Sequence, residues 1–423
     1  MEVKNSLINT FWGFLKISQL IGHFPFKKGI DEATKFELIK PLDSCISFCT
    51  FTLSHSIMFG SLAIGVYISS SQMNLTMWNF LKSIYVDINE TSLDTITWVI
   101  TFPATTTISA ILELKLFSQK KDIPILYNFY ASSLKRILVI KPPIKNKIQY
   151  LFYGLVLTQI LSAVMFCVGF YLYAAETTET LYFTHIIFLM GSFIFQFFQS
   201  SPLLILLILL CELAGNLCIW TETLVHTLKE NDMARVLKTH LHECSQFYYG
   251  LKMTSQLFSQ QMGIFTALFL GNLIIFVYRF LAFFLGNYEF NISLSFVAIG
   301  FGAIILLITY YMIFAIFVSQ YVVDDVQNLV EVLQRLPIEY NQMACIDNEL
   351  HPAMYVRELL AKKLESFYGF DAGGFCKLNK SIISSITANF ITYVIVLIQF
   401  KTSENTLENR NSDVGSHLQN NTL

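Results

Sequence analysis

The sequence predicts an all-α membrane protein with seven transmembrane helices, its N-terminus inside, its C-terminus outside, and cytoplasmic helical extensions of the later spans. The first observation is composition: of 423 residues, 54% are hydrophobic and 14% are charged, with a mean hydropathy of +0.53, whereas about 25% of an ordinary soluble domain is charged. The second is a set of apolar stretches long enough for a bilayer core of ~30 Å, which takes about 20 residues per helix. The third is that basic residues gather on one side of these stretches.

The seven stretches follow one another along the chain at residues 43–69, 93–117, 148–174, 181–211, 263–285, 294–321 and 381–400. Residues 1–42 precede them as a cytoplasmic segment, where Lys16 interrupts the apolar run and argues against a cleavable signal. Residues 43–321 hold the first six membrane helices. The fourth stretch continues through Pro202 to Cys211, which predicts a tilted helix or one that extends beyond the membrane.

The distribution of charge sets the orientation. Of the 28 Lys and Arg residues, 23 lie in residues 1–42, 118–147, 212–262 and 322–380, and 3 lie in the segments on the other side. Cytoplasmic loops carry the excess of basic residues, so the N-terminus is inside and residues 401–423 form an extracellular tail. Four N-x-[ST] glycosylation acceptors fall on the outer side, namely Asn74, Asn89, Asn291 and Asn420.

The sequence of the two long cytoplasmic segments predicts helices that extend the spans. Residues 212–262 and 322–380 carry apolar residues at helical spacing and are expected to form anchor helices that bundle in the cytosol. Glu230-Asn231-Asp232 provides a turn within the first segment. In the second segment, Pro337 ends one stripe and Gly369 follows another.

The last span carries a polar stripe. Polar and small residues recur at steps of 4, 3, 4 and 3, namely Ser385, Asn389, Thr392, Val396 and Gln399. The opposite face is almost wholly apolar, with Ile383, Ile386, Phe390, Val394 and Leu397. Two interpretations remain open. The stripe lines an ion pore, which requires several copies of the chain around an axis, or it hydrogen-bonds to neighbouring helices.

The same span contains a recognisable motif. Residues 392–400 read Thr392-Tyr393, five hydrophobic residues, then Gln399-Phe400. This resembles, without a gap, the signature of insect gustatory receptors. The preceding residues 370–375 also resemble the segment that leads into the last helix of that family. Seven spans with an inside N-terminus and an outside C-terminus extend the agreement to nearly the whole chain.

The resemblance implies a tastant-gated, non-selective cation channel in the plasma membrane of chemosensory neurons, built as a homotetramer or by co-assembly with related receptors. It places Gln399 and Phe400 at the extracellular gate of the pore, and it has Thr392 and Tyr393 hold the helix within the bundle. Receptors of the common sugar branch usually have Glu where this chain has Val394. Bitter-type and fructose-type branches therefore stay open.

The family's ligand pocket is expected in the outer half of spans two to six. Rings that stack and hydroxyl, indole or imidazole groups that hydrogen-bond suit small tastants. Arg279 is a cation within a span, which suits an anionic or hydroxyl-rich partner, although snorkelling explains it equally well. The candidate ligand-binding residues at this depth are Trp98, Phe102, Phe170, Tyr171, Tyr182, His185, Tyr278, Arg279 and Phe283.

Three other classes of membrane protein are alternatives. An odorant-type receptor channel is the nearest alternative. A G-protein-coupled receptor has the opposite topology, and a secondary transporter built from duplicated halves would show an internal repeat, which the sequence lacks. Phosphate-binding and dinucleotide motifs, zinc spacings and nucleophile elbows are also lacking. The sequence therefore predicts no enzyme activity, no cofactor, no bound metal and no nucleic-acid partner.

Overall fold

The structure is a computed structural model that describes residues 10–20, 24, 26–28, 36–38, 49, 52, 111–112, 114–116, 118–119, 121–136, 144–177, 183–230, 233–285, 292–335 and 350–420. The first predicted span and most of the second lie outside these residues. The helices are α2 (Trp12–Leu20), α6 (Asp122–Arg136), α7 (Ile144–Thr177), α8 (Phe183–Glu230), α9 (Met233–Leu285), α10 (Ile292–Gln334), α12 (Leu350–Glu365) and α13 (Ser381–Asn420). The structure also contains two pairs of antiparallel strands. β1 (Phe26–Lys28) pairs with β2 (Phe36–Leu38), and β3 (Phe370–Ala372) pairs with β4 (Cys376–Leu378).

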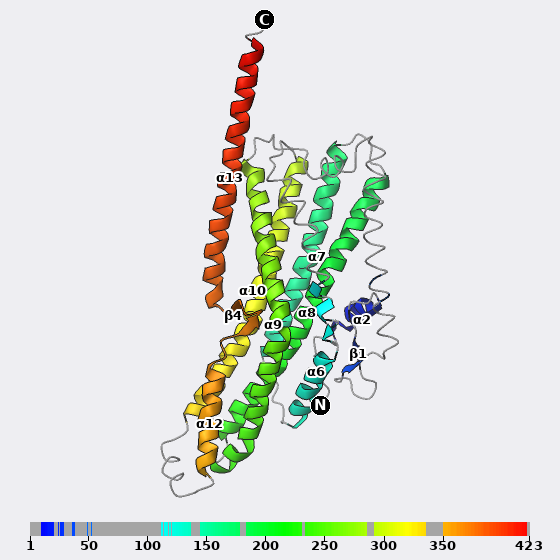
Figure 1. Ribbon diagram of the computed structural model, residues 1–423. Coiled ribbons are helices and arrows are strands. Elements are labelled where there is room, and N and C mark those ends of the chain that lie inside the picture. Colours follow the sequence, from blue (N-terminus) through cyan, green and yellow to red (C-terminus); the bar gives the residue numbers. More distant parts are fainter. Residues whose placement is uncertain are drawn as a thin grey trace.

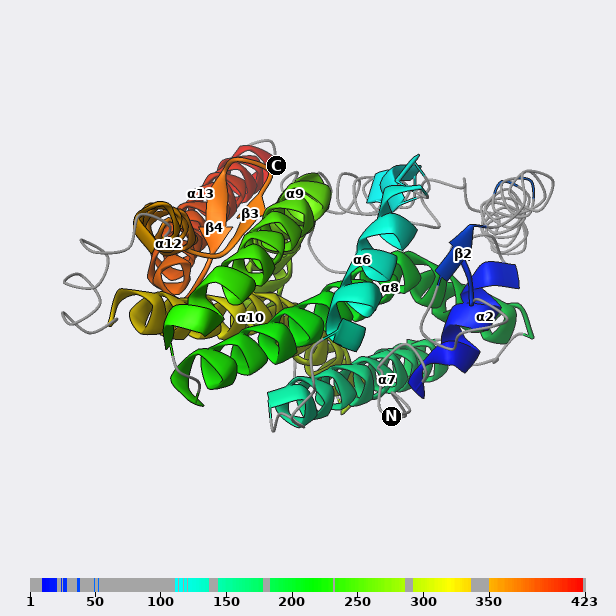
Figure 2. The ribbon, with the colours of Figure 1, turned by 90° about the horizontal axis from the view of Figure 1, so that it is seen from below.

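The long helices α7, α8, α9 and α10 run side by side as a bundle (Figure 1). α10 packs on α7, α8 and α9, so it lies at the centre of the described bundle. Its buried residues and those of α8 form most of the hydrophobic core. Seen along its axis, the bundle has α13 at one edge, beside α9, and α2 at the far end (Figure 2).

Among the residues that the structure describes, four helical segments are long and apolar enough to cross a membrane. They are Pro202–Leu228, Leu241–Tyr278, Gly302–Gln334 and Ser381–Phe400. In the most apolar 18-residue window of each segment, 94% of the residues are buried in the first and 6% in the last. The chain therefore buries its α8 segment almost completely, whereas most residues of the α13 segment stay at its surface.

The cytoplasmic extensions predicted for the later spans are present as continuous helices. α8 continues through Pro202 and ends at Glu230, and α9 begins at Met233, on the two sides of the predicted turn. α10 likewise continues past residue 321 to Gln334. α12 packs on both α9 and α10, so the lower ends of these helices form one cluster (Figure 1).

Two features of the fold were not predicted. The β1–β2 pair precedes the membrane bundle, and the β3–β4 hairpin fills the connection between α12 and α13. The second hairpin is the more informative, because it packs on α9 and contacts α10. It fixes the position at which the last helix begins.

Candidate functional site: the last helix and the hairpin before it

α13 touches its own chain through one apolar face. Ile382, Ile386 and Phe390 pack against the hydrophobic core, and Val394 is buried one turn further on. These residues repeat at a step of four, so they form one row along the side of the helix that faces α9. Ile386, Phe390 and Val394 of the predicted apolar face therefore dock on the bundle, whereas Ile383 of that face is exposed.

The polar stripe points away from the chain. Ser385, Asn389, Thr392, Val396 and Gln399 are all exposed. The Thr392 hydroxyl donates to the carbonyl oxygen of Ala388 in its own helix, at 2.9 Å. The side-chain amides of Asn389 and Gln399 have no hydrogen-bond partner among the described residues. In the part of the chain that the structure describes, the stripe therefore makes no hydrogen bond to a neighbouring helix.

The motif residues are equally exposed. The Tyr393 ring is 58% exposed and the Phe400 ring 63%. Within one chain, the described contacts of α13 are made by the apolar row, so the expectation that Thr392 and Tyr393 hold the helix within the bundle stays a prediction. Sequence spacing separates two faces of a helix but does not say which neighbour each face meets.

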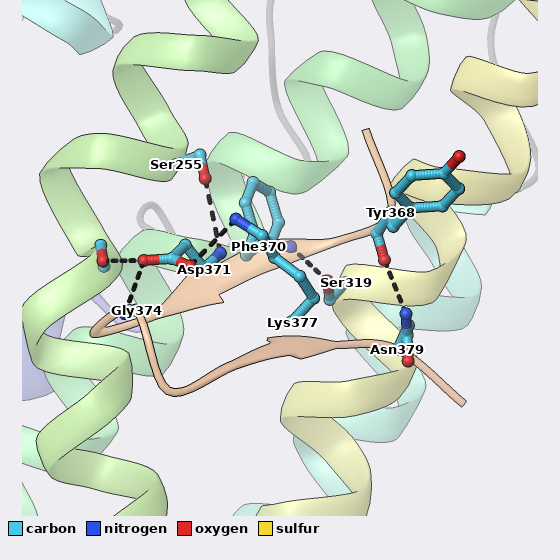
Figure 3. Close-up of polar contacts among 9 residues, drawn as sticks. Ser255, Ser319, Tyr368, Phe370, Asp371, Gly374, Lys377 and Asn379 are labelled. Carbon is cyan, nitrogen blue, oxygen red and sulfur yellow. Dashed lines mark hydrogen bonds and ion pairs between the residues drawn. The ribbon is translucent and has the colours of Figure 1, made fainter. Parts of the chain in front are cut away.

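The hairpin before α13 is tied to both α9 and α10 (Figure 3). On the α10 side, the Phe370 N–H donates to Ser319 Oγ at 2.9 Å, and the Lys380 N–H donates to Gln320 Oε1 at 3.0 Å. Phe370 and Ser319 are buried. Both ends of the hairpin are therefore fixed to α10 immediately before α13 begins.

Asp371 makes the main attachment to α9. Its carboxylate accepts a hydrogen bond from the Ser259 hydroxyl and another from the Gly374 N–H at 2.9 Å. It also forms an ion pair with Lys377 Nζ at 2.9 Å. Its own N–H donates to Ser255 Oγ at 3.4 Å (Figure 3). The hydrogen bond from Ser259 is the main cause that holds the pKa of Asp371 below its ordinary value, and Lys377 adds to it.

The local sequence explains the hairpin. Phe370, Ala372 and Leu378 are buried, while Asp371 pairs with Lys377 across the two strands. Gly373 and Gly374 have φ values of +66° and +78°, a conformation that glycine adopts without strain. The two glycines therefore supply the turn that joins the two short strands.

Replacing Asp371 with Asn tests this attachment. The neutral amide accepts weaker hydrogen bonds and loses the ion pair, so we expect the free energy of unfolding to fall by about 1–2 kcal/mol. A carboxylate with a lowered pKa contributes stability above its ordinary pKa and loses it only as pH falls through the lowered value. The difference from the unsubstituted chain should therefore persist from pH ~8 down to about 5.

Thermal unfolding of the purified chain measures this difference. Glu365→Gln is the matched control, since its carboxylate is exposed and has no ion pair among the described residues. Equal melting temperatures for the Asp371 and Glu365 variants would contradict the role given to Asp371.

The candidate ligand-binding residues are placed only in part. Tyr278 on α9 is fully buried. The structure places Phe170 and Tyr171 on α7, His185 on α8, and Arg279 and Phe283 on α9, without describing their side chains. The other candidate ligand-binding residues lie outside the described residues, namely Trp98, Phe102 and Tyr182. So do three of the glycosylation acceptors, Asn74, Asn89 and Asn291, whereas the fourth, Asn420, is the last residue of α13. These residues stay predictions.

A bundle of long apolar helices, whose last member docks by one face and exposes the others, defines a multi-pass, all-helical membrane protein. The same architecture is found in solved structures of the insect olfactory receptor OR5 from Machilis hrabei. The complex of that receptor with eugenol is 12% identical, has a TM-score of 0.58, and aligns with 94% of this chain and 100% of its own. Another structure of the receptor is 14% identical, has a TM-score of 0.60, and aligns with 93% and 98%. The sequence matches no protein-family model and no curated protein.

These structures establish the fold. They confirm the prediction of an all-α, multi-pass membrane protein, and the suspected resemblance to insect chemoreceptors holds at the level of fold over nearly the whole chain.

Proposed function

We propose that the chain is a small-molecule-gated, non-selective cation channel in which several copies surround a central pore and α13 lines it. One observation carries this proposal. In the apolar segment Ser381–Phe400, only 6% of the residues of the most apolar 18-residue window are buried within the chain, and the polar stripe is exposed, away from the docking face.

Three environments are open to that stripe, namely lipid, the other helices of the chain, and water in a pore. Lipid is a poor partner for the free amides of Asn389 and Gln399, because an amide without a hydrogen bond in an apolar medium costs roughly 2–7 kcal/mol. Among the described residues, no other helix supplies a hydrogen bond to the stripe. Water in a pore, lined by the same helix from other copies, satisfies these amides and leaves Val396 as an apolar ring that closes by dewetting.

The stripe also has a competing explanation, which is contact with neighbouring helices, including those of other copies. In that case Asn389 and Gln399 would hydrogen-bond to a second chain and enclose no water. A closed, symmetric ring of copies is favoured over an open contact between two chains, because it gives the same environment to each α13. We propose a homotetramer, or co-assembly with related receptors, in the plasma membrane of chemosensory neurons.

Two classes of ligand are candidates, a tastant and an odorant. The motif of residues 392–400 supports a gustatory receptor whose ligand is a tastant. The fold shared with an olfactory receptor solved with eugenol supports an odorant-type receptor for small, partly apolar molecules. Calcium influx in cells that express the chain, tested with sugars, alkaloids and volatile phenols, separates the two.

Thiol accessibility tests the orientation of α13. Asn389→Cys and Val396→Cys place a thiol on the stripe, and we expect a charged, water-soluble thiol reagent to block ligand-evoked current in both variants. Val394→Cys is the matched control on the same helix, because Val394 is 7% exposed and faces the bundle. The unsubstituted chain gives the baseline of the native cysteines.

The outcome separates the explanations. Block at residues 389 and 396, without block at residue 394, supports a hydrated pore. Equal rates of block at all three positions, or no effect at residues 389 and 396, would contradict it and favour contact between copies.

A further inference from the structure

A polar pocket of about 500 Å³ lies between the segment before α6, helix α9 and the β3–β4 hairpin. Its lining combines two lysines, Lys115 and Lys377, with side chains from two successive turns of α9. Gln119 forms part of the wall and is held there, since its Nε2 donates to the Leu257 carbonyl oxygen at 2.9 Å and its Oε1 accepts from Gln261. Residues far apart in the sequence thus build one shaped site.

The pocket presents more donors than acceptors to a ligand. Lys115 is half-buried and has no ion pair among the described residues. The side-chain amides of Gln256 and Gln260, one turn apart on α9, are likewise without partners in the described part of the chain. The one carboxylate in the lining, Asp371, is already occupied by Ser259, Gly374 and Lys377.

The height of the pocket matches the cytoplasmic edge of the membrane. Its floor on α9 lies just before Gly263, where the predicted fifth span begins, and the hairpin ends at Leu378, three residues before α13 starts. Phe375 at the tip of the hairpin is 88% exposed, an unusual state for a large apolar ring in water. At the edge of a bilayer, that ring can insert among acyl chains beside the pocket.

We propose that this pocket binds the phosphate headgroup of an anionic phospholipid of the cytoplasmic leaflet. Two lysines and uncommitted amide donors suit a phosphate that also bears hydroxyl groups, as in phosphatidylinositol phosphates. The exposed Phe375 favours a lipid over a free anion, because it adds an apolar contact that inorganic phosphate cannot use. The inference rests on the membrane fold and its basic inner side, and not on channel activity.

Binding of a fluorescent short-chain phosphatidylinositol phosphate to the purified full chain in detergent tests the proposal. The double variant Lys115→Gln, Lys377→Gln should bind the probe at least about tenfold more weakly, because each lysine near such a headgroup contributes about 1 kcal/mol. Lys362→Gln, an exposed lysine on α12, is the matched control and should bind like the unsubstituted chain. Lys115→Gln alone should weaken binding several-fold while leaving the Asp371–Lys377 pair intact.

Two controls keep the result interpretable. Lys115→Arg should retain binding, and equal melting temperatures for Lys115→Gln and Lys362→Gln would show that the fold is intact. Equal affinity of the double variant and the unsubstituted chain would overturn the proposal. Displacement of the probe by inorganic phosphate at the same concentration as by unlabelled lipid would also overturn it, since the site would then take a free anion.

Discussion

Replacing Gln399 with Glu is expected to change the ion preference of the channel, and replacing it with Lys to suppress cation current. Gln399 is exposed on the side of α13 opposite the docking face, near the outer end of the apolar segment. In an assembly around an axis, one substitution places a ring of like charges at one level of the pore. Two unit charges 4 Å apart interact by about 1 kcal/mol in water and about 4 kcal/mol at an effective dielectric of 20.

The expected size of the effect follows from that range. Since about 1.4 kcal/mol corresponds to a factor of ten, Gln399→Glu should raise the permeability ratio of divalent to monovalent cations by about tenfold, and Gln399→Lys should lower cation conductance by a similar factor. Reversal potentials and single-channel currents in ligand-stimulated membrane patches measure both. Gln399→Ala should change conductance without inverting the preference.

Gln327→Glu is the matched control for this experiment. Gln327 is an exposed glutamine on the cytoplasmic part of α10, so the same charge is added away from α13. A shift in reversal potential for the Gln399 variant alone places that side chain in the ion pathway. If the two variants are indistinguishable from the unsubstituted chain, α13 does not line a pore.

Local patterns in the sequence predicted the parts of this molecule that depend on neighbouring residues. The charged and polar residues 230–232 separate two helical stripes, and α8 and α9 meet across them. The alternation of faces on residues 381–400 likewise separated an apolar face from a polar one, and Phe390 and Val394 of that apolar face contact the bundle. Both features depend on periodicity within one helix, which the sequence states directly.

Features built from distant residues could not be predicted in this way. Each strand of the β3–β4 hairpin has three residues, too few for a clear alternation. Its stability comes instead from Ser259 on α9 and Ser319 on α10, and nothing in the local sequence marks these serines as its partners. Lys115 carried no expected role, because only the fold brings it to the same pocket as Lys377.

Replacing Gly263 with Val is expected to push the hairpin off α9. A Cβ atom at residue 263 would lie 2.9 Å from the Cα atom of Gly373 and 3.1 Å from the carbonyl carbon of Ala372. These are backbone atoms, which cannot rotate aside as a flexible side chain can. Overpacking of this kind costs about 1–3 kcal/mol, and the bonds from Ser259 to Asp371 lengthen with it.

Gly271→Val separates this clash from the general effect of valine in a helix. Gly271 lies on the same helix, and an added Cβ atom there meets no atom within 4 Å. Melting temperatures of the two purified variants measure the effect on the fold, and we expect a clear loss only at residue 263. A similar melting temperature for both variants would mean that the hairpin tolerates displacement from α9.

The functional consequence follows from the position of the hairpin. It joins α9 and α10 to the first residue of α13, so a movement of the bundle reaches the last helix through it. If this connection transmits ligand binding to the pore, Gly263→Val should reduce ligand-evoked current more than it reduces the amount of chain at the cell surface. Gly271→Val should leave the ratio of current to surface protein unchanged, and an unchanged ratio in both variants would show that gating does not pass through this hairpin.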